Sequence, residues 1–187
     1  WDAEGNELPA WFEVEGNVVR ILVDDQDATW PLMVDPVLTT ASATVNGENT
    51  NDNFGYAVEA AGDVNNDGYD DMAVGAYGYA SNTGRVYVYH GSASGLSTTA
   101  AATLDGASSS SYFGAALRGA GDVNGDGYDD LVVGAYTYSS SAGEAYVYYG
   151  SSSGITTSGA VTLSSASGAG TEFGRCVSGI GDVNGDG

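Results

Sequence analysis

Three short segments of the chain carry oxygen-bearing side chains at every second position. The first runs Asp63-Val-Asn-Asn-Asp-Gly-Tyr-Asp-Asp71, the second begins at Asp122, and the third begins at Asp182. Ca²⁺ binds roughly six to eight oxygen atoms at about 2.3–2.6 Å, and a short loop can supply them only by curling around the ion. A glycine at the sixth position permits the sharp turn that this requires. The segments therefore predict calcium-binding loops.

The expected ligands are the side chains at positions one, three, five and nine and the backbone carbonyl oxygen at position seven. They are Asp63, Asn65, Asp67, Tyr69 and Asp71 in the first loop and Asp122, Asn124, Asp126, Tyr128 and Asp130 in the second. The side chain at position eight, Asp70 or Asp129, points away from the ion in this geometry, so we expect it to be solvated.

Two alternatives to this kind of calcium loop, an Asx turn and an EF-hand, use similar residues. A single loop of this kind could be an ordinary Asx turn, but turn chemistry alone does not explain several copies at a fixed interval. An EF-hand needs a glutamate at position twelve and a helix on each side, whereas position twelve here is Val74 or Val133. The residues after each loop are apolar and β-branched, which is typical of a strand. We therefore expect each loop to lie inside a β-hairpin.

The loops belong to a longer repeat. Asp63 and Asp122 are 59 residues apart, Asp122 and Asp182 are 60 apart, and a Phe-Gly pair precedes each loop by nine residues. The first repeat has four apolar or alternating segments, at residues 56–60, 71–74, 85–90 and 101–104, and no window has helical periodicity. Four-stranded units repeated around an axis predict an all-β fold, a β-propeller, with each Phe ring packed between blades.

The Phe-Gly pair, the Asp-x-Asn-x-Asp-Gly-x-x-Asp loop and the Gly-Ala-Tyr after it together resemble the FG-GAP repeat. This repeat is the blade unit of integrin α-subunit propellers and of many bacterial surface proteins, although the family usually has Gly-Ala-Pro in place of Gly-Ala-Tyr. The resemblance covers residues 41–187, as repeats of about 54–112 and 113–172 and an incomplete one at 173–187. It implies a propeller with calcium in the hairpin loops of some blades. It also extends the ligand set to Asp182, Asn184 and Asp186 of the third loop.

Residues 1–40 lack the repeat. The segments 11–15 and 18–23 flank Gly16-Asn17 and predict a hairpin, and residues 29–34 predict a further strand. We interpret 1–40 as the C-terminal part of an upstream β-rich domain and 41–187 as a propeller fragment. Because two repeats and part of a third cannot close a ring, we expect the chain to be a fragment of a longer protein.

The net charge of the chain limits the classes of partner that it can bind. The chain has 25 acidic residues, four basic ones and a net charge of −21. Nothing supplies a basic patch for nucleic acid, and an anionic membrane would repel this segment, so direct membrane insertion is not expected. Calcium loops of extracellular modules often bind with dissociation constants of roughly 10⁻⁴–10⁻³ M. Such sites fill outside the cell, which favours an extracellular, secreted or cell-surface location.

The sequence holds no nucleophile–base pair, His-rich zinc site or phosphate loop, so we do not expect an enzyme. The leading hypothesis is a calcium-stabilised propeller that binds an extracellular protein or glycan as an adhesion module, through loop tips at residues 77–83 and 136–142. The alternatives are an accessory domain of a secreted hydrolase and a surface-layer or spacer element. Cys176, the single cysteine, takes the place of Ala57 and Ala116 in the repeat, so we expect it to be a small buried side chain.

Overall fold

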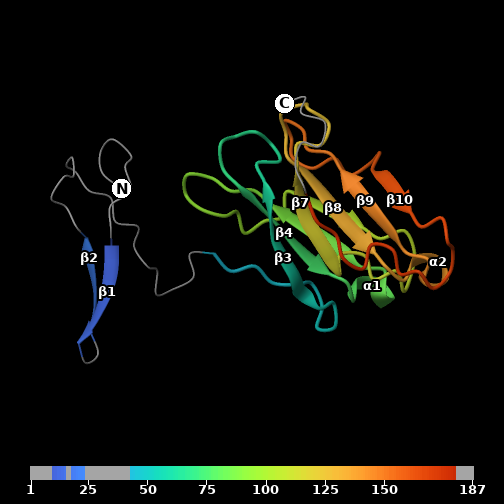
Figure 1. The fold of residues 1–187 in the computed structure, drawn as a ribbon, viewed down its shortest axis with the longest axis horizontal. Helices are drawn as coiled ribbons and strands as arrows, with labels where there is room; N and C mark the ends of the chain where they lie inside the picture. Colours follow the sequence, from blue (N-terminus) through green and yellow to red (C-terminus); the bar gives the residue numbers. More distant parts are fainter. Residues whose placement is uncertain (1–9, 16–17, 24–42, 180–187) are drawn as a thin grey trace. The chain divides into compact units, whose positions relative to one another are not determined.

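The structure is a computed structural model that describes residues 10–15, 18–23 and 43–179 (Figure 1). The chain separates into two compact units, residues 1–41 and 42–187. The first unit contains β1 (Ala10–Glu15) and β2 (Val18–Val23), which pair antiparallel with Glu15 opposite Val18, so the predicted hairpin is present. The predicted strand at residues 29–34 and the third-loop ligands Asp182, Asn184 and Asp186 lie outside the described residues.

The second unit contains two sheets of four strands. The strands of the first are β3 (Phe54–Gly62), β4 (Asp71–Ala76), β5 (Arg85–Tyr89) and β6 (Ala102–Asp105). Those of the second are β7 (Ala116–Gly121), β8 (Asp130–Ala135), β9 (Glu144–Tyr148) and β10 (Val161–Ser164). Strands adjacent in sequence pair antiparallel within each sheet. The prediction of an all-β fold of four-stranded units is confirmed, and the sheets are consistent with two blades of a β-propeller.

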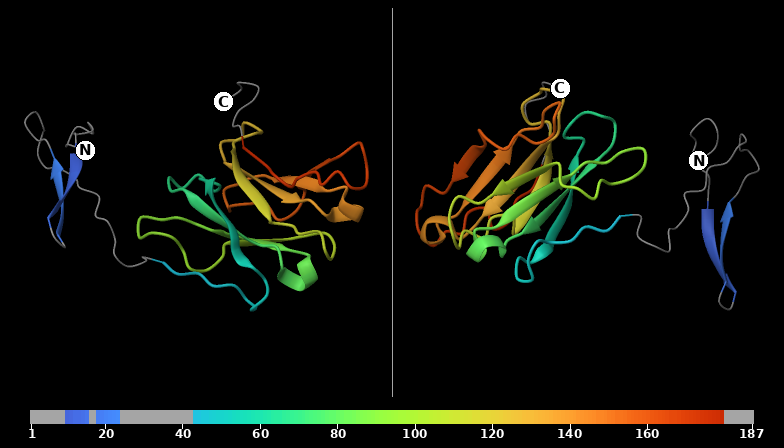
Figure 2. Two further views of the ribbon diagram at one scale, coloured as in Figure 1. Left: turned by 60° about the horizontal axis from the view of Figure 1, so that its bottom comes forward. Right: turned by 180° about the vertical axis from the view of Figure 1, so that it is seen from behind.

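The two sheets pack face to face through one apolar cluster (Figure 2). The cluster contains Val86 and Val88 of β5 and Leu131 and Val133 of β8, and all four are fully buried. Phe113 lies in the same cluster with only 1% of its surface exposed, so this Phe ring packs between the sheets as predicted. Phe54 belongs instead to the cluster on the other face of the first sheet, and Phe173 is 39% exposed. The inner strands β3 and β7 are neighbours (Figure 1).

A second apolar cluster covers the other face of the first sheet. It contains Tyr87 and Tyr89 of β5, with Val74 and the partly buried Phe54 packed beside them. Because β5 places valines on one face and tyrosines on the other, both of its faces are buried. This is the pattern expected of a sheet that lies between two apolar layers.

Two four-residue turns, α1 (Tyr79–Asn82) and α2 (Tyr138–Ser141), follow β4 and β8. Residues 80–82 and 139–141 have positive φ angles between 47° and 62°, a left-handed conformation that costs an L-residue about 1–2 kcal/mol. The carbonyl oxygens of Ser81 and Asn82 accept hydrogen bonds from the N–H groups of Ser110 and Tyr112, at 3.2 and 3.0 Å. The left-handed turn thus directs its carbonyl oxygens to the segment that precedes the second sheet. No helix in the described part of the chain is long and apolar enough to cross a membrane.

Candidate metal loops and the tyrosine row

The first loop connects β3 to β4, and its side chains at positions one, three and five converge. The backbone N–H of Asp67 donates to Asp63 Oδ1 and to Asn65 Oδ1, each at 3.0 Å. Asn65 Nδ2 donates to Asp67 Oδ2 at 2.9 Å, and the N–H of Gly68 donates to Asp63 Oδ2 at 2.8 Å. Gly68 has φ +92°, as expected for the sharp turn at position six. These contacts gather oxygen atoms from three side chains around one turn.

The second loop, between β7 and β8, repeats this geometry. The N–H of Asp126 donates to Asp122 Oδ1 at 3.1 Å and to Asn124 Oδ1 at 3.0 Å. Asn124 Nδ2 donates to Asp126 Oδ2 at 2.9 Å, and Gly127, with φ +88°, donates to Asp122 Oδ2 at 2.7 Å. The N–H of Gly127 is the main cause that lowers the pKa of Asp122 below its usual value, so this carboxylate is held in its charged form.

The position-nine carboxylates are buried and bonded to the backbone. Asp71 accepts from the N–H groups of Val64 and Gly91, at 3.0 and 2.8 Å. Asp130 accepts from the corresponding groups of Val123 and Gly150 at the same two distances. Each side chain therefore ties the start of its loop to the segment after the third strand of its sheet. The loop pattern predicted these residues only as ligands and gave no indication of this second role.

Position nine also interacts electrostatically with the rest of the loop. Burial is the main cause that raises the pKa of Asp130, and the negative charges of Asp126 and Asp122 raise it further. Burial likewise raises the pKa of Asp71, with a contribution from the charge of Asp67. The carboxylates of each loop therefore lie close enough to repel one another.

The donor set of the loops fits a hard cation. Among the residues that the structure describes, no three Asp, Glu, His or Cys side chains form a metal cluster by themselves. The loops offer instead carboxylate and amide oxygens together with a backbone carbonyl, the all-oxygen mixture that Ca²⁺ accepts. In the first loop each side-chain oxygen at positions one, three, five and nine accepts a single hydrogen bond, which leaves a lone pair for an ion.

The two position-eight residues differ. Asp70 is exposed, as predicted, but the prediction that Asp129 is solvated is wrong, because this residue is half-buried. Asp129 Oδ2 accepts a hydrogen bond from the N–H of Asp63 at 2.8 Å, and the N–H of Asp129 donates to the Asp63 carbonyl at 3.2 Å. The reason is that the first loop lies directly beside the second. A side chain that points away from its own turn therefore reaches the neighbouring one.

A row of four tyrosine rings lies at the other end of the strands. The ring centroids of Tyr56 and Tyr77 are 4.6 Å apart, and Tyr112 is 5.5 Å from both Tyr77 and Tyr136. The guanidinium group of Arg175 lies 5.7 Å from the Tyr136 ring centroid. Burial is the main cause that raises the pKa of Tyr136. The four rings line a small cavity of about 80 Å³, and Tyr56 is 64% exposed.

Of the four tyrosines in this row, Tyr77 and Tyr136 lie in the predicted loop tips, whereas Tyr56 and Tyr112 do not. Tyr56 follows Phe54 by two residues and Tyr112 precedes Phe113 by one, so these two tyrosines do not recur at one repeat position. The repeat pattern therefore gave no signal that the four rings would meet. Cys176 is exposed, so the prediction that it is buried is wrong. It lies outside any strand that the structure describes.

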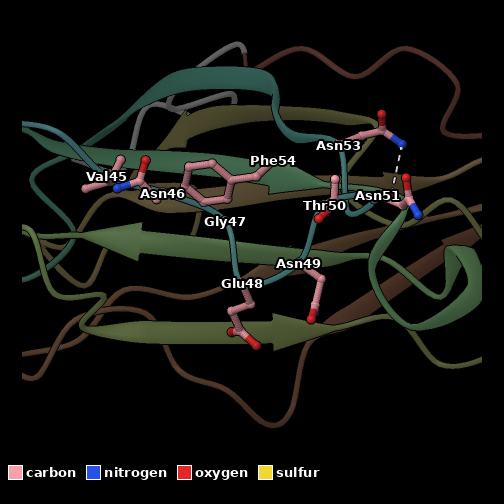
Figure 3. A pocket seen from close by; sticks show the side chains of 9 residues that line it. All are labelled: Val45, Asn46, Gly47, Glu48, Asn49, Thr50, Asn51, Asn53 and Phe54. Atoms are coloured by element: carbon pink, nitrogen blue, oxygen red, sulfur yellow. Dashed lines mark hydrogen bonds between the residues drawn. The ribbon is translucent and has the colours of Figure 1, made fainter.

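A separate hollow runs along the segment 45–54 that precedes and opens β3 (Figure 3). Phe54 packs closely on Gly47, where a Cβ atom would lie 2.6 Å from the Phe54 Cβ. The carboxylate of Glu48 is already bound by Arg85 and by the Tyr87 hydroxyl, each at 3.0 Å. None of the residues that line this hollow forms a nucleophile–base pair, so it does not indicate catalysis.

Two successive four-stranded sheets, each with an oxygen-rich loop between its first two strands, define a repeat protein of the propeller class. Residues 54–89 and 113–148 each match the family model for the FG-GAP repeat. The chain therefore contains two FG-GAP repeats similar to those of integrin α-subunits, as its sequence motifs predicted.

Its relatives are integrin α-subunits. The chain is 43% identical to integrin alpha-IIb of Mus musculus over 101 residues, 53% of this chain and 10% of that protein. It is 44% identical to integrin alpha-8 of Gallus gallus over 100 residues, 51% of this chain and 9% of that protein. Integrin alpha-E of Mus musculus is 35% identical over 132 residues, 65% of this chain and 10% of that protein. The chain thus spans about a tenth of the length of these relatives.

Proposed function

We propose that this chain is part of an extracellular, calcium-stabilised FG-GAP propeller that serves as an adhesion or ligand-binding module. The observation that carries the proposal is the same oxygen-lined turn in two successive repeats, with three side chains converging in each. The similarity to integrin α-subunits supports a ligand-binding propeller. We divide the chain into the end of an upstream β-rich domain, residues 1–40, and the propeller segment, residues 41–187.

The calcium ion has a structural role in this proposal. Asp63, Asn65, Asp67, the Tyr69 carbonyl and Asp71 hold it in the first loop, and the residues at the same positions hold it in the second. In the third loop Asp182, Asn184 and Asp186 are the ligands that this sequence contains. Each ion offsets two negative charges where the carboxylates now repel one another. The buried Asp71 and Asp130 are already oriented by two backbone N–H groups each, so binding requires little rearrangement of position nine.

The ligand surface is the end of the strands opposite the calcium loops. It comprises the tips at residues 77–83 and 136–142 together with the tyrosine row, whose amphipathic rings suit a protein or glycan partner. The partner is an extracellular protein or glycan and not a nucleic acid, because the chain has a net charge of −21. The module has no catalytic activity of its own.

Thermal unfolding tests the calcium proposal. The chain is unfolded with about 2 mM calcium and with excess EGTA, beside the variant Asp67→Ala/Asp126→Ala and the control Asp70→Ala. For a dissociation constant of about 10⁻⁴ M, each occupied site adds about 1.8 kcal/mol, so two sites raise the melting temperature by roughly 10 °C. The double variant loses most of this rise and the control keeps it. An unchanged melting temperature together with no heat of calcium binding would reduce the loops to Asx turns.

A second assay tests the ligand surface. The chain is screened against arrays of extracellular glycans and matrix proteins, together with Tyr77→Ser/Tyr136→Ser. Any ligand that the chain captures is expected to be lost in the tyrosine variant, because two of the four rings are removed. Capture that is unchanged after both substitutions would exclude the tyrosine row as the ligand surface.

A further inference from the structure

The two candidate loops are joined by a reciprocal pair of hydrogen bonds. The Asp63 N–H donates to the Asp129 carboxylate at 2.8 Å, and the Asp129 N–H donates to the Asp63 carbonyl at 3.2 Å. Asp63 is position one of the first loop. Asp129 lies between Tyr128 and Asp130, positions seven and nine of the second loop. Asp129 of the second loop thus binds both the backbone N–H and the backbone carbonyl of Asp63, which is the first ligand residue of the first loop.

The contact is tightly packed as well as hydrogen-bonded. A Cβ atom on Gly62, which has φ +81°, would lie 2.1 Å from Asp129 Oδ2. A Cβ atom on Gly150 would lie 2.4 Å from the Asp129 carbonyl oxygen and 2.8 Å from that of Val64. The N–H of Ser151 also donates to the Val64 carbonyl, at 3.1 Å. Both glycines therefore make room for the approach of one loop to the other.

We propose that the two loops are coupled through Asp129, so that a divalent cation in one loop raises the affinity of the other. The inference rests on the proposed cation binding. The Asp130 carboxylate is already held by two backbone N–H groups. A cation in the second loop additionally fixes the Tyr128 carbonyl, and therefore fixes Asp129 between the two. Asp129 then holds Asp63, whose carboxylate is a ligand of the first loop. The first ion to bind orders this shared segment and bears the loss of conformational entropy. The second ion binds to a segment that is already ordered, and therefore binds more tightly.

The chain offers a matched control. Asp70 occupies position eight of the first loop, as Asp129 does in the second, but its side chain is exposed. Asp70→Ala and Asp129→Ala therefore remove the same charge from the same loop position. Only Asp129→Ala removes the side-chain half of the link, the bond from the Asp63 N–H, and leaves the backbone half in place. Neither residue is a proposed ligand. A change that appears in Asp129→Ala alone reports the link and not the lost charge.

Calcium titration of the calcium-depleted full chain by calorimetry tests the coupling. All variants carry Asp186→Ala, which removes the contribution of the third loop, and Asp126→Ala is added to disable the second loop. We expect Asp126→Ala to weaken calcium binding at the first loop about fivefold or more. In the Asp129→Ala background the same change has a much smaller effect, because only the backbone bond between the loops remains, whereas in Asp70→Ala its full effect remains. Asp129→Asn keeps an acceptor oxygen and retains most of the coupling.

A measurement without metal tests the link itself. In EGTA, the Asp63 amide proton is protected from hydrogen exchange in the parent chain and in Asp70→Ala, and exchanges faster in Asp129→Ala. Equal exchange in all three chains would remove the physical basis of the proposal. If Asp126→Ala leaves the calcium affinity of the first loop unchanged, the coupling is refuted, whereas the proposed calcium sites stand. Absence of any calcium binding would instead overturn the proposed function and the coupling together.

Discussion

Replacing Asp130 by alanine separates its structural role from its role as a ligand. The carboxylate is fully buried and accepts hydrogen bonds from the N–H groups of Val123 and Gly150 at 3.0 and 2.8 Å. Asp130→Ala leaves both donors without an acceptor, and a buried unsatisfied group costs about 1–3 kcal/mol. The gain from no longer burying a charge offsets part of this loss. We therefore expect a destabilisation of about 3 kcal/mol even without calcium.

The assay is urea unfolding in EGTA, followed by circular dichroism. With a slope of about 2 kcal/mol per molar urea, the midpoint falls by about 1.5 M. Asp126→Ala is the matched control, because Asp126 is an exposed member of the same loop and water replaces its hydrogen bonds. We expect it to cost under about 1 kcal/mol in EGTA. Equal, small effects of the two substitutions in EGTA would refute the reasoning, because position nine would then matter only through the metal.

Three further predictions concern residues of the turns, the inter-loop contact and the core between the sheets. Ser140→Gly relieves the left-handed strain of α2, where φ is 59°, and is expected to stabilise the chain by about 1 kcal/mol in urea unfolding. Gly62→Ala is expected to cost more than Gly68→Ala, because both have positive φ but only Gly62 faces the Asp129 carboxylate. A cost no greater than the roughly 1–2 kcal/mol of backbone strain alone would contradict this. Phe113→Ala opens a cavity between the two sheets and is expected to cost about 3–5 kcal/mol, measured by the same unfolding.

The strands and their order could be predicted because the information is local and repeated. Alternation along residues 85–90 shows that both faces of that strand are covered, and the spacing of the Phe-Gly pairs identifies the unit. Gly68 and Gly127 identify the sharp turns, which the structure confirms with φ +92° and +88°. Local pattern and repeat length are therefore sufficient for the sheets.

Contacts between repeats could not be predicted in the same way. The two position-eight aspartates both follow Asp-Gly-Tyr, yet among the described residues Asp129 contacts the neighbouring loop with its side chain while Asp70 is exposed. The left-handed turns contain Ala, Ser and Asn but no glycine, so the usual signal for positive φ is missing. Such features depend on which segment the fold brings alongside, and a single repeat does not carry that information.

The unequal repeat lengths, 59 and 60 residues, indicate where the chain accepts extra residues. Val86 pairs with Leu104 and Ala145 with Leu163, so the spacing stays at 59 through the outer strands. Ser81 binds Ser110 while Ser140 binds Gly170, so the additional residue lies between 163 and 170. This segment is almost wholly exposed, and lengthening such a loop costs only a few tenths of a kcal/mol. It is therefore the natural place to graft a peptide or a reporter without disturbing either the sheets or the cation loops.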